Sequence, residues 1–199
     1  RDTFPIDGLQ DSHALENLKI LEIYNSHVPS SLFLNLENLT SLYIKEYAGS
    51  ISEIPFLCLP HIKSVKLEYC QGDILGWPLS HLEDLSLHSC SLENLVFLKD
   101  LKELKSLSLK RNAYHPLLPE YLFPLCHLSS LISLDLIQPI ISPEKLINLA
   151  SFLPNLKRFK LRSPISIFDI PASSYLKGEE IRKRIKEAFS GIDLELQED

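Results

Sequence analysis

The sequence predicts an α/β solenoid, in which short repeats stack on one another, and three observations carry this prediction. First, the pattern L-x-x-L-x-x-L-x-L occurs seven times, and its four template positions are apolar in every copy. Second, corresponding residues of successive copies are 20 to 27 residues apart, a spacing typical of repeat architectures. Third, the pattern stops after the seventh copy, and a different segment follows. Because one such repeat cannot cover its own apolar side, we expect the copies to stack and bury it.

The copies begin at residues that are all leucines, and the stretch from the fifth copy is ambiguous when it is taken alone. They start at Leu15, Leu36, Leu59, Leu79, Leu101, Leu128 and Leu153. In "LKELKSLSLKRN", residues 101–112, the first three leucines have helical spacing, whereas Leu107 and Leu109 alternate as in a strand. Since a repeat outranks a local pattern, the stretch takes whatever structure the other copies take.

Residues 15–166 resemble the leucine-rich repeat family. The family pattern L-x-x-L-x-L-x-x-N/C-x-L is met by "LKSLSLKRNAY", with Asn112 in the asparagine position, and by "LEDLSLHSCSL" and "IKSVKLEYCQG", with Cys90 and Cys70 there. The other copies depart from it, since they have Ser26, Tyr47, Pro139 and Pro164 at this position. The resemblance implies a curved array whose concave side is a parallel β-sheet, with a strand that starts near Ser106 in the fifth copy.

On the convex side we expect mostly irregular or 3₁₀ segments, because most copies have too few residues there for a full helix. "SPEKLINLASFLP" is the exception: Ser142 can cap a helix, Pro143 suits its first position, and apolar residues at 146, 149, 150 and 152 form a stripe. The insert "NAYHPLLPEYLFPLCH" accounts for the longest separation, and its three prolines argue against one continuous helix.

The two ends of the array differ. At the C-terminal end, Ile181, Ile185 and Phe189 share one helical face, Gly191 can end the helix, and residues 192, 194 and 196 alternate as in a strand. We therefore divide the chain into a partial N-terminal repeat or edge (1–14), seven leucine-rich repeats (15–166) and a C-terminal helix-strand cap (167–199). The chain begins at Arg1, and two interpretations stay open: an upstream domain precedes it in a longer protein, or the edge is protected in another way.

Composition favours a water-soluble chain that does not bind nucleic acid. The 199 residues carry a formal net charge of -6, so there is no general basic footprint. No apolar run is long enough to cross a bilayer, which argues against a membrane partner. The four cysteines, Cys58, Cys70, Cys90 and Cys126, form either a disulfide framework or a set of reduced, buried thiols. Their wide spacing favours reduced thiols, and with them the cytoplasm or the nucleus.

No catalytic motif emerges from the sequence. There is no phosphate-binding glycine loop, no G-x-S-x-G and no H-E-x-x-H, so we expect no enzyme and no cofactor. His88 and Cys90 are two residues apart, but the repeat phase directs His88 away from the sheet and Cys90 toward the core. Cys126 next to His127 is a similarly weak pair, and the scattered histidines have no metal-ligand spacing.

Function is therefore expected on the residues that alternate with the buried ones in each strand. They form a mixed polar face with tyrosines in the early repeats, serines in the middle and an all-basic last strand. We predict a protein partner on this face, with an acidic or phosphorylated segment at the basic strand. Two versions stay open: the substrate-recognition arm of an F-box ubiquitin ligase, and a sensor or regulatory domain of an immune receptor, bacterial effector or phosphatase regulator. The predicted contacts are Glu22, Tyr24, Tyr43, Lys45, Lys66, Glu68, His88, Lys110, Asp135, Arg158, Lys160 and Arg162.

Overall fold

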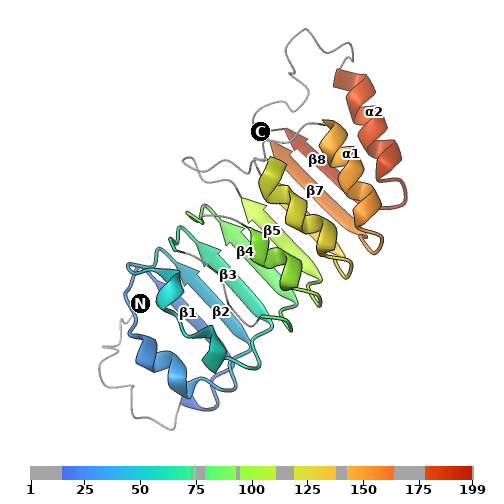
Figure 1. Ribbon diagram of the computed structural model, residues 1–199. Coiled ribbons are helices and arrows are strands. Elements are labelled where there is room, and N and C mark those ends of the chain that lie inside the picture. Colours follow the sequence, from blue (N-terminus) through green and yellow to red (C-terminus); the bar gives the residue numbers. More distant parts are fainter. Residues whose placement is uncertain are drawn as a thin grey trace.

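The computed structural model describes residues 15–72, 74, 79–92, 95–110, 119–137, 143–163 and 178–198, and within them eight strands form one parallel sheet (Figure 1). The strands follow one another in the sheet in the order of the sequence. They are β1 (Ile20–Tyr24), β2 (Ser41–Lys45), β3 (Ser64–Glu68), β4 (Asp84–His88), β5 (Ser106–Lys110), β6 (Ser133–Ile137), β7 (Arg158–Ser163) and β8 (Asp193–Glu198). This repeat-like parallel sheet fits the predicted α/β solenoid.

The register of the sheet follows the apolar template. Val65 pairs with Leu85, which pairs with Leu107, and Leu107 pairs with Leu134. Because equivalent leucines lie side by side, they form continuous apolar rows on the inner side of the sheet. Leu107 is 1% exposed, so the ambiguous stretch from 101 does enter a strand, at Ser106.

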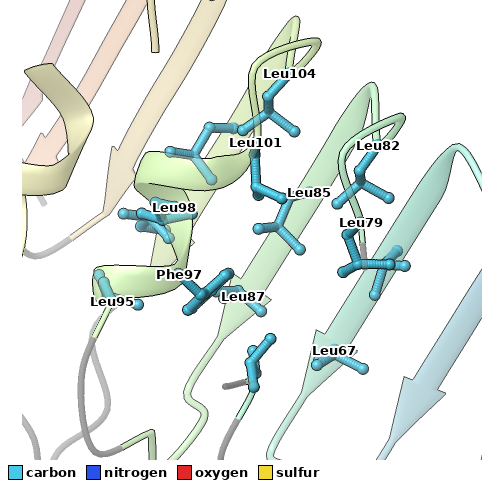
Figure 2. Packing of buried hydrophobic residues seen from close by; sticks show 14 of the residues in the cluster. Leu67, Leu79, Leu82, Leu85, Leu87, Leu95, Phe97, Leu98, Leu101 and Leu104 are labelled. Atoms are coloured by element: carbon cyan, nitrogen blue, oxygen red, sulfur yellow. The ribbon is translucent and has the colours of Figure 1, made fainter. Parts of the chain in front are cut away.

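Short helical segments cover the inner side of the sheet, and most of them are 3₁₀ helices, as predicted. They are η3 (Ser30–Asn35), η4 (Ile51–Glu53), η5 (Phe56–Cys58), η6 (Val96–Asp100) and η7 (Pro119–His127). The exception is also where the sequence predicts it, because α1 (Pro143–Phe152) is an α-helix that starts at its proline. Figure 2 shows the resulting core, in which Phe97 and Leu98 of η6 face Leu85 and Leu87 of β4.

A residue with a left-handed backbone directly follows each of the first four strands. Asn25, Glu46, Tyr69 and Ser89 have φ between 45° and 56° and directly follow β1 to β4. Each of their N–H groups donates to the carbonyl of the last residue of the next strand, as from Tyr69 to His88 at 2.9 Å. This hydrogen bond stabilises a conformation that costs a residue with a Cβ about 1 to 2 kcal/mol.

Behind this turn, side chains tie successive repeats together at the position where the family has asparagine. The Tyr47 hydroxyl donates to the carbonyl of Val28 at 2.8 Å. The Cys70 thiol lies 3.7 Å from the carbonyl of Ile44, and the Cys90 thiol lies 3.4 Å from that of Leu67. Each of these three side chains thus contacts a backbone carbonyl of the preceding repeat, although none of them is asparagine. Asn112, Pro139 and Pro164 lie outside the described residues.

The helix and strand predicted at the C-terminal end are present. After α2 (Gly178–Ala188), Gly191 has a φ of +84°, which suits glycine. β8 then pairs with β7 in parallel. Phe189, just after α2, stacks on Phe159 of β7 with ring centroids 4.6 Å apart, and both rings are buried. The capping role of this segment stays a prediction, and residues 1–14 and 164–177 lie outside the described part of the chain.

Candidate functional site

The outward side chains of the strands form three rows across the sheet, on the side that the helical segments do not cover. We call this side the open face. Parallel pairing in register aligns the first, third and fifth residues of each strand, so all twelve predicted contact residues lie in these rows. The third-position row is Glu22, Tyr43, Lys66, Ser86, Ser108, Asp135, Lys160 and Glu195, and the fifth-position row is Tyr24, Lys45, Glu68, His88, Lys110, Ile137, Arg162 and Gln197.

Glu68 is the centre of a hydrogen-bonded network over β1 to β4. The Tyr43 hydroxyl donates to Glu68 Oε2 at 2.9 Å, and Lys66 Nζ lies 2.9 Å from Glu68 Oε1. Tyr24 donates to Glu22 at 2.7 Å, and its ring meets that of Tyr43 edge-on, with centroids 5.3 Å apart. These contacts fix the orientation of both tyrosine rings on the open face.

The electrostatics of the network keep Glu68 ionised and Tyr43 protonated. Burial by itself would raise the pKa of Glu68, but hydrogen bonds from Lys66 and Tyr43 hold that pKa below its ordinary value. Burial, together with the hydrogen bond to the Glu68 carboxylate, raises the pKa of Tyr43 to about 12. Losing the Tyr43 proton would place an anion beside another anion.

His88 lies where the network meets the serine-rich centre of the face. Its Nε2 is 3.1 Å from Ser86 Oγ and 2.9 Å from Ser108 Oγ, and its Nδ1 is 3.6 Å from Glu68 Oε1. Burial lowers the pKa of His88, so the ring is neutral at pH 7. Cys90 instead faces the backbone carbonyls behind the sheet. The two side chains point to opposite sides, as the repeat phase predicts.

The basic strand β7 has carboxylates on both neighbouring strands. Arg162 Nη2 donates to Asp135 Oδ2 on β6 at 2.8 Å, and Lys160 Nζ donates to Glu195 Oε1 on β8 at 2.5 Å. Arg158 Nε lies 3.8 Å from Asp193 Oδ2, also on β8. Glu187 of α2 instead pairs with Lys183 in the same helix, with Nζ 4.0 Å from Oε1.

Apolar and aromatic side chains are exposed mainly at the β1 end of the face. Ile20 is 61% exposed, Tyr24 47% and Tyr69 54%. Lys66 Nζ lies 4.4 Å above the centre of the Tyr43 ring, and Lys45 Nζ lies 5.9 Å from that of Tyr69. We call Ile20, Tyr24, Tyr43, Lys66 and Tyr69 the aromatic cluster.

The predicted set of contacts left out several residues of the face. Ile20, Ser86 and Ser108 are outward strand positions that the same alternation identifies. They were left out because a small or apolar side chain does not by itself indicate a binding contact. Asp193 and Glu195 alternate with Leu194 and Leu196 in the segment assigned to the cap, which hid their place on the face. Tyr69 was missed because it follows its strand, where alternation no longer applies.

Two further observations bear on chemistry at the surface. Within the described residues, no three His, Cys, Asp or Glu side chains gather in a way that could hold a metal ion. In the same part of the chain, no helix has the length and apolar character needed to cross a membrane.

Neither family models nor curated proteins give a match to this chain.

Proposed function

We propose that this chain is a leucine-rich-repeat-type interaction module, not an enzyme, and that it binds a protein partner on the open face. In this proposal the open face is the concave side that the repeat pattern implies. Curved repeat arrays offer extended surfaces of this kind, because each repeat adds one strand of outward side chains. Free Cys58, Cys70, Cys90 and Cys126 suit a module of the cytoplasm or nucleus.

The aromatic cluster is the observation that carries the proposal. Tyrosine is enriched among the few residues that dominate binding energy at protein interfaces. Here two of the three tyrosines are about half exposed, and the third is held beneath Lys66 and bonded to Glu68. Because the hydroxyls of Tyr24 and Tyr43 are hydrogen-bonded and their rings are in contact, a partner would spend little conformational entropy in ordering these two side chains.

The basic strand supports an acidic or phosphorylated partner less than the sequence alone does. That expectation rested on three like charges side by side on one strand. Asp135, Asp193 and Glu195 now provide compensation within the sheet. An anionic partner would have to displace these carboxylates, so the proposal places the main anchor at the aromatic cluster instead.

Two specific versions of the module stay open as proposals. In the first, the array is the substrate-recognition arm of an F-box-type ubiquitin ligase, and cysteine in the asparagine position fits such repeats. In the second, it is a sensor or regulatory domain of an immune receptor, bacterial effector or phosphatase regulator. Any sequence upstream of Arg1 in the full gene distinguishes them, since only the first version requires an F-box segment there.

The test compares proteins captured from the native cell extract by three forms of the chain. These are the wild type, the double variant Tyr24→Ala/Tyr43→Ala, and the control Leu57→Ser, which alters a 77% exposed residue of η5 away from the open face. We expect a partner that the wild type and the control retain and the double variant loses. Its affinity is then measured with purified proteins, and at least a tenfold loss is expected for the double variant. Equal retention by all three forms would contradict the proposal.

A further inference from the structure

Cys70 and Cys90 are held side by side by the backbone of two consecutive repeats. Both directly follow the left-handed residue that ends a strand, Tyr69 after β3 and Ser89 after β4. The N–H of Ser91 donates to the carbonyl of Cys70 at 2.9 Å, and Gln71 forms a parallel bridge with Ser91. Neighbouring strands are about 4.8 Å apart, which is within the range of about 4.4 to 6.8 Å that a disulfide needs between its Cα atoms.

The two thiols also meet on the same side of the sheet. The Cys90 sulfur lies 3.4 Å from the carbonyl of Leu67 in the preceding repeat, so its side chain reaches back toward Cys70. The Cys90 thiol beside it lowers the pKa of Cys70 to about 7, and the same contact raises the pKa of Cys90. The lowered pKa favours the thiolate of Cys70, which is the nucleophilic form of a cysteine.

Cys70 and Cys90 differ in their exposure to solvent, which limits the size of the oxidant that can reach them. Cys70 is 1% exposed, whereas Cys90 is only partly buried. A bulky oxidant cannot contact Cys70, and Cys90 is the more exposed member of the pair. A hydroperoxide such as hydrogen peroxide has the necessary size and reacts with thiolates.

We propose that Cys70 and Cys90 form an intramolecular disulfide when the chain meets a small hydroperoxide. The Cys70 thiolate attacks one peroxide oxygen, the O–O bond breaks, and the leaving hydroxide takes up a proton to become water. Cys70 is now a sulfenic acid. The Cys90 sulfur attacks the Cys70 sulfur, the S–O bond breaks, and the hydroxyl leaves with the Cys90 proton as a second water. Two thiols are oxidised to one disulfide, and one hydrogen peroxide is reduced to two waters.

The disulfide would connect the ends of β3 and β4 and would replace the hydrogen bonds that both thiols make to backbone carbonyls. It would also cross-link two consecutive repeats at the position where the repeat pattern has asparagine or cysteine. This inference does not depend on the proposed partner, because it concerns the inner side of the sheet.

The test treats the full chain, folded and at neutral pH, with hydrogen peroxide, alkylates the remaining thiols and identifies linked peptides by mass spectrometry. We expect one dominant intramolecular link, between Cys70 and Cys90, which a reductant reverses. Cys58 and Cys126, in η5 and η7, should be alkylated instead and serve as internal controls. The rate of linking should rise as pH increases through about 7, where Cys70 loses its proton.

The variant Cys90→Ser separates the two steps. It keeps Cys70 but removes the second sulfur, so peroxide should take Cys70 to the sulfenic and then the sulfinic acid without a link. Circular dichroism of each sample verifies that the fold is intact. If Cys70 and Cys90 were both fully alkylated when the peroxide-treated wild type is unfolded in denaturant and then alkylated, the proposal would be overturned. The same follows if links to Cys58 or Cys126, or between molecules, were as abundant.

Discussion

Removing the Phe189 ring should separate the C-terminal helix from the sheet. Phe189 is 1% exposed and stacks on Phe159, which is fully buried. Truncating a buried phenylalanine to alanine costs about 3 to 5 kcal/mol. For a chain of this size, that corresponds to a decrease in melting temperature of roughly 6 to 20 °C. Since a folded domain is stable by only about 5 to 15 kcal/mol, Phe189→Ala would remove a large fraction of the total.

The assay combines chemical denaturation with hydrogen exchange. Stacked repeats can open locally, so exchange should increase most in β7 and β8, next to the lost contact. The matched control is Phe152→Ala, because Phe152 is the same residue type but is 50% exposed at the end of α1. We expect the control to cost about 1 kcal/mol or less. Equal losses for the two variants, or unchanged exchange in β7, would refute the reasoning.

Four further predictions concern the core, the end of the array and two titrations. Leu107→Ala should lower the free energy of unfolding by about 2 to 5 kcal/mol. Ser108→Ala loses one hydrogen bond to His88 and should lower it by about 0.5 to 1.5 kcal/mol. Equal shifts in melting temperature would contradict the assignment of Leu107 to the core and Ser108 to the open face. A fragment 1–166 should aggregate or unfold, which light scattering detects, and a fragment as soluble and cooperative as the full chain would remove the capping role. Lys105 and Lys63 both bond to the Glu83 carboxylate and hold its pKa at about 2. The ionised Glu83 therefore stabilises the fold above the ordinary carboxyl pKa, and this effect is lost as pH falls through about 2. Glu83→Gln should flatten this part of an acid unfolding curve. Tyr43, with its pKa raised to about 12, should stabilise the fold below the ordinary tyrosine pKa and lose that effect as pH rises through about 12. Tyr43→Phe should remove one late-titrating tyrosine from an ultraviolet titration.

The sequence predicted the strands because one physical requirement recurs in every repeat. Leu85 and Leu107 must be buried together, so their alternation with Ser86 and Ser108 is visible without any knowledge of neighbours. The α-helix at 143–152 was predictable for the same local reason, since its proline and its apolar stripe lie within one segment. Periodicity thus reveals which side of a strand each residue occupies.

Pairing between outward side chains could not be predicted in this way, because it depends on the positions of several strands at once. Asp135 and Arg162 meet across 27 residues, and Lys160 and Glu195 meet across 35. Finding these pairs requires the register of β6 to β8, and the sequence pattern did not mark β8 as a further strand of the same sheet. The strand-ending turn was hidden too, since Tyr69 has no preference for a left-handed backbone.

The carboxylates of β8 have a second consequence, for contacts between molecules. Among the described strands, β8 forms the last edge of the sheet, and such an edge offers unpaired N–H and C=O groups to any passing strand. Asp193 and Glu195 place negative charge on the strand that forms this edge. A second copy that approached with the same edge would bring like charges together at the spacing of paired strands, where repulsion is strongest. The residues that balance β7 therefore also oppose the pairing of two copies through their β8 edges.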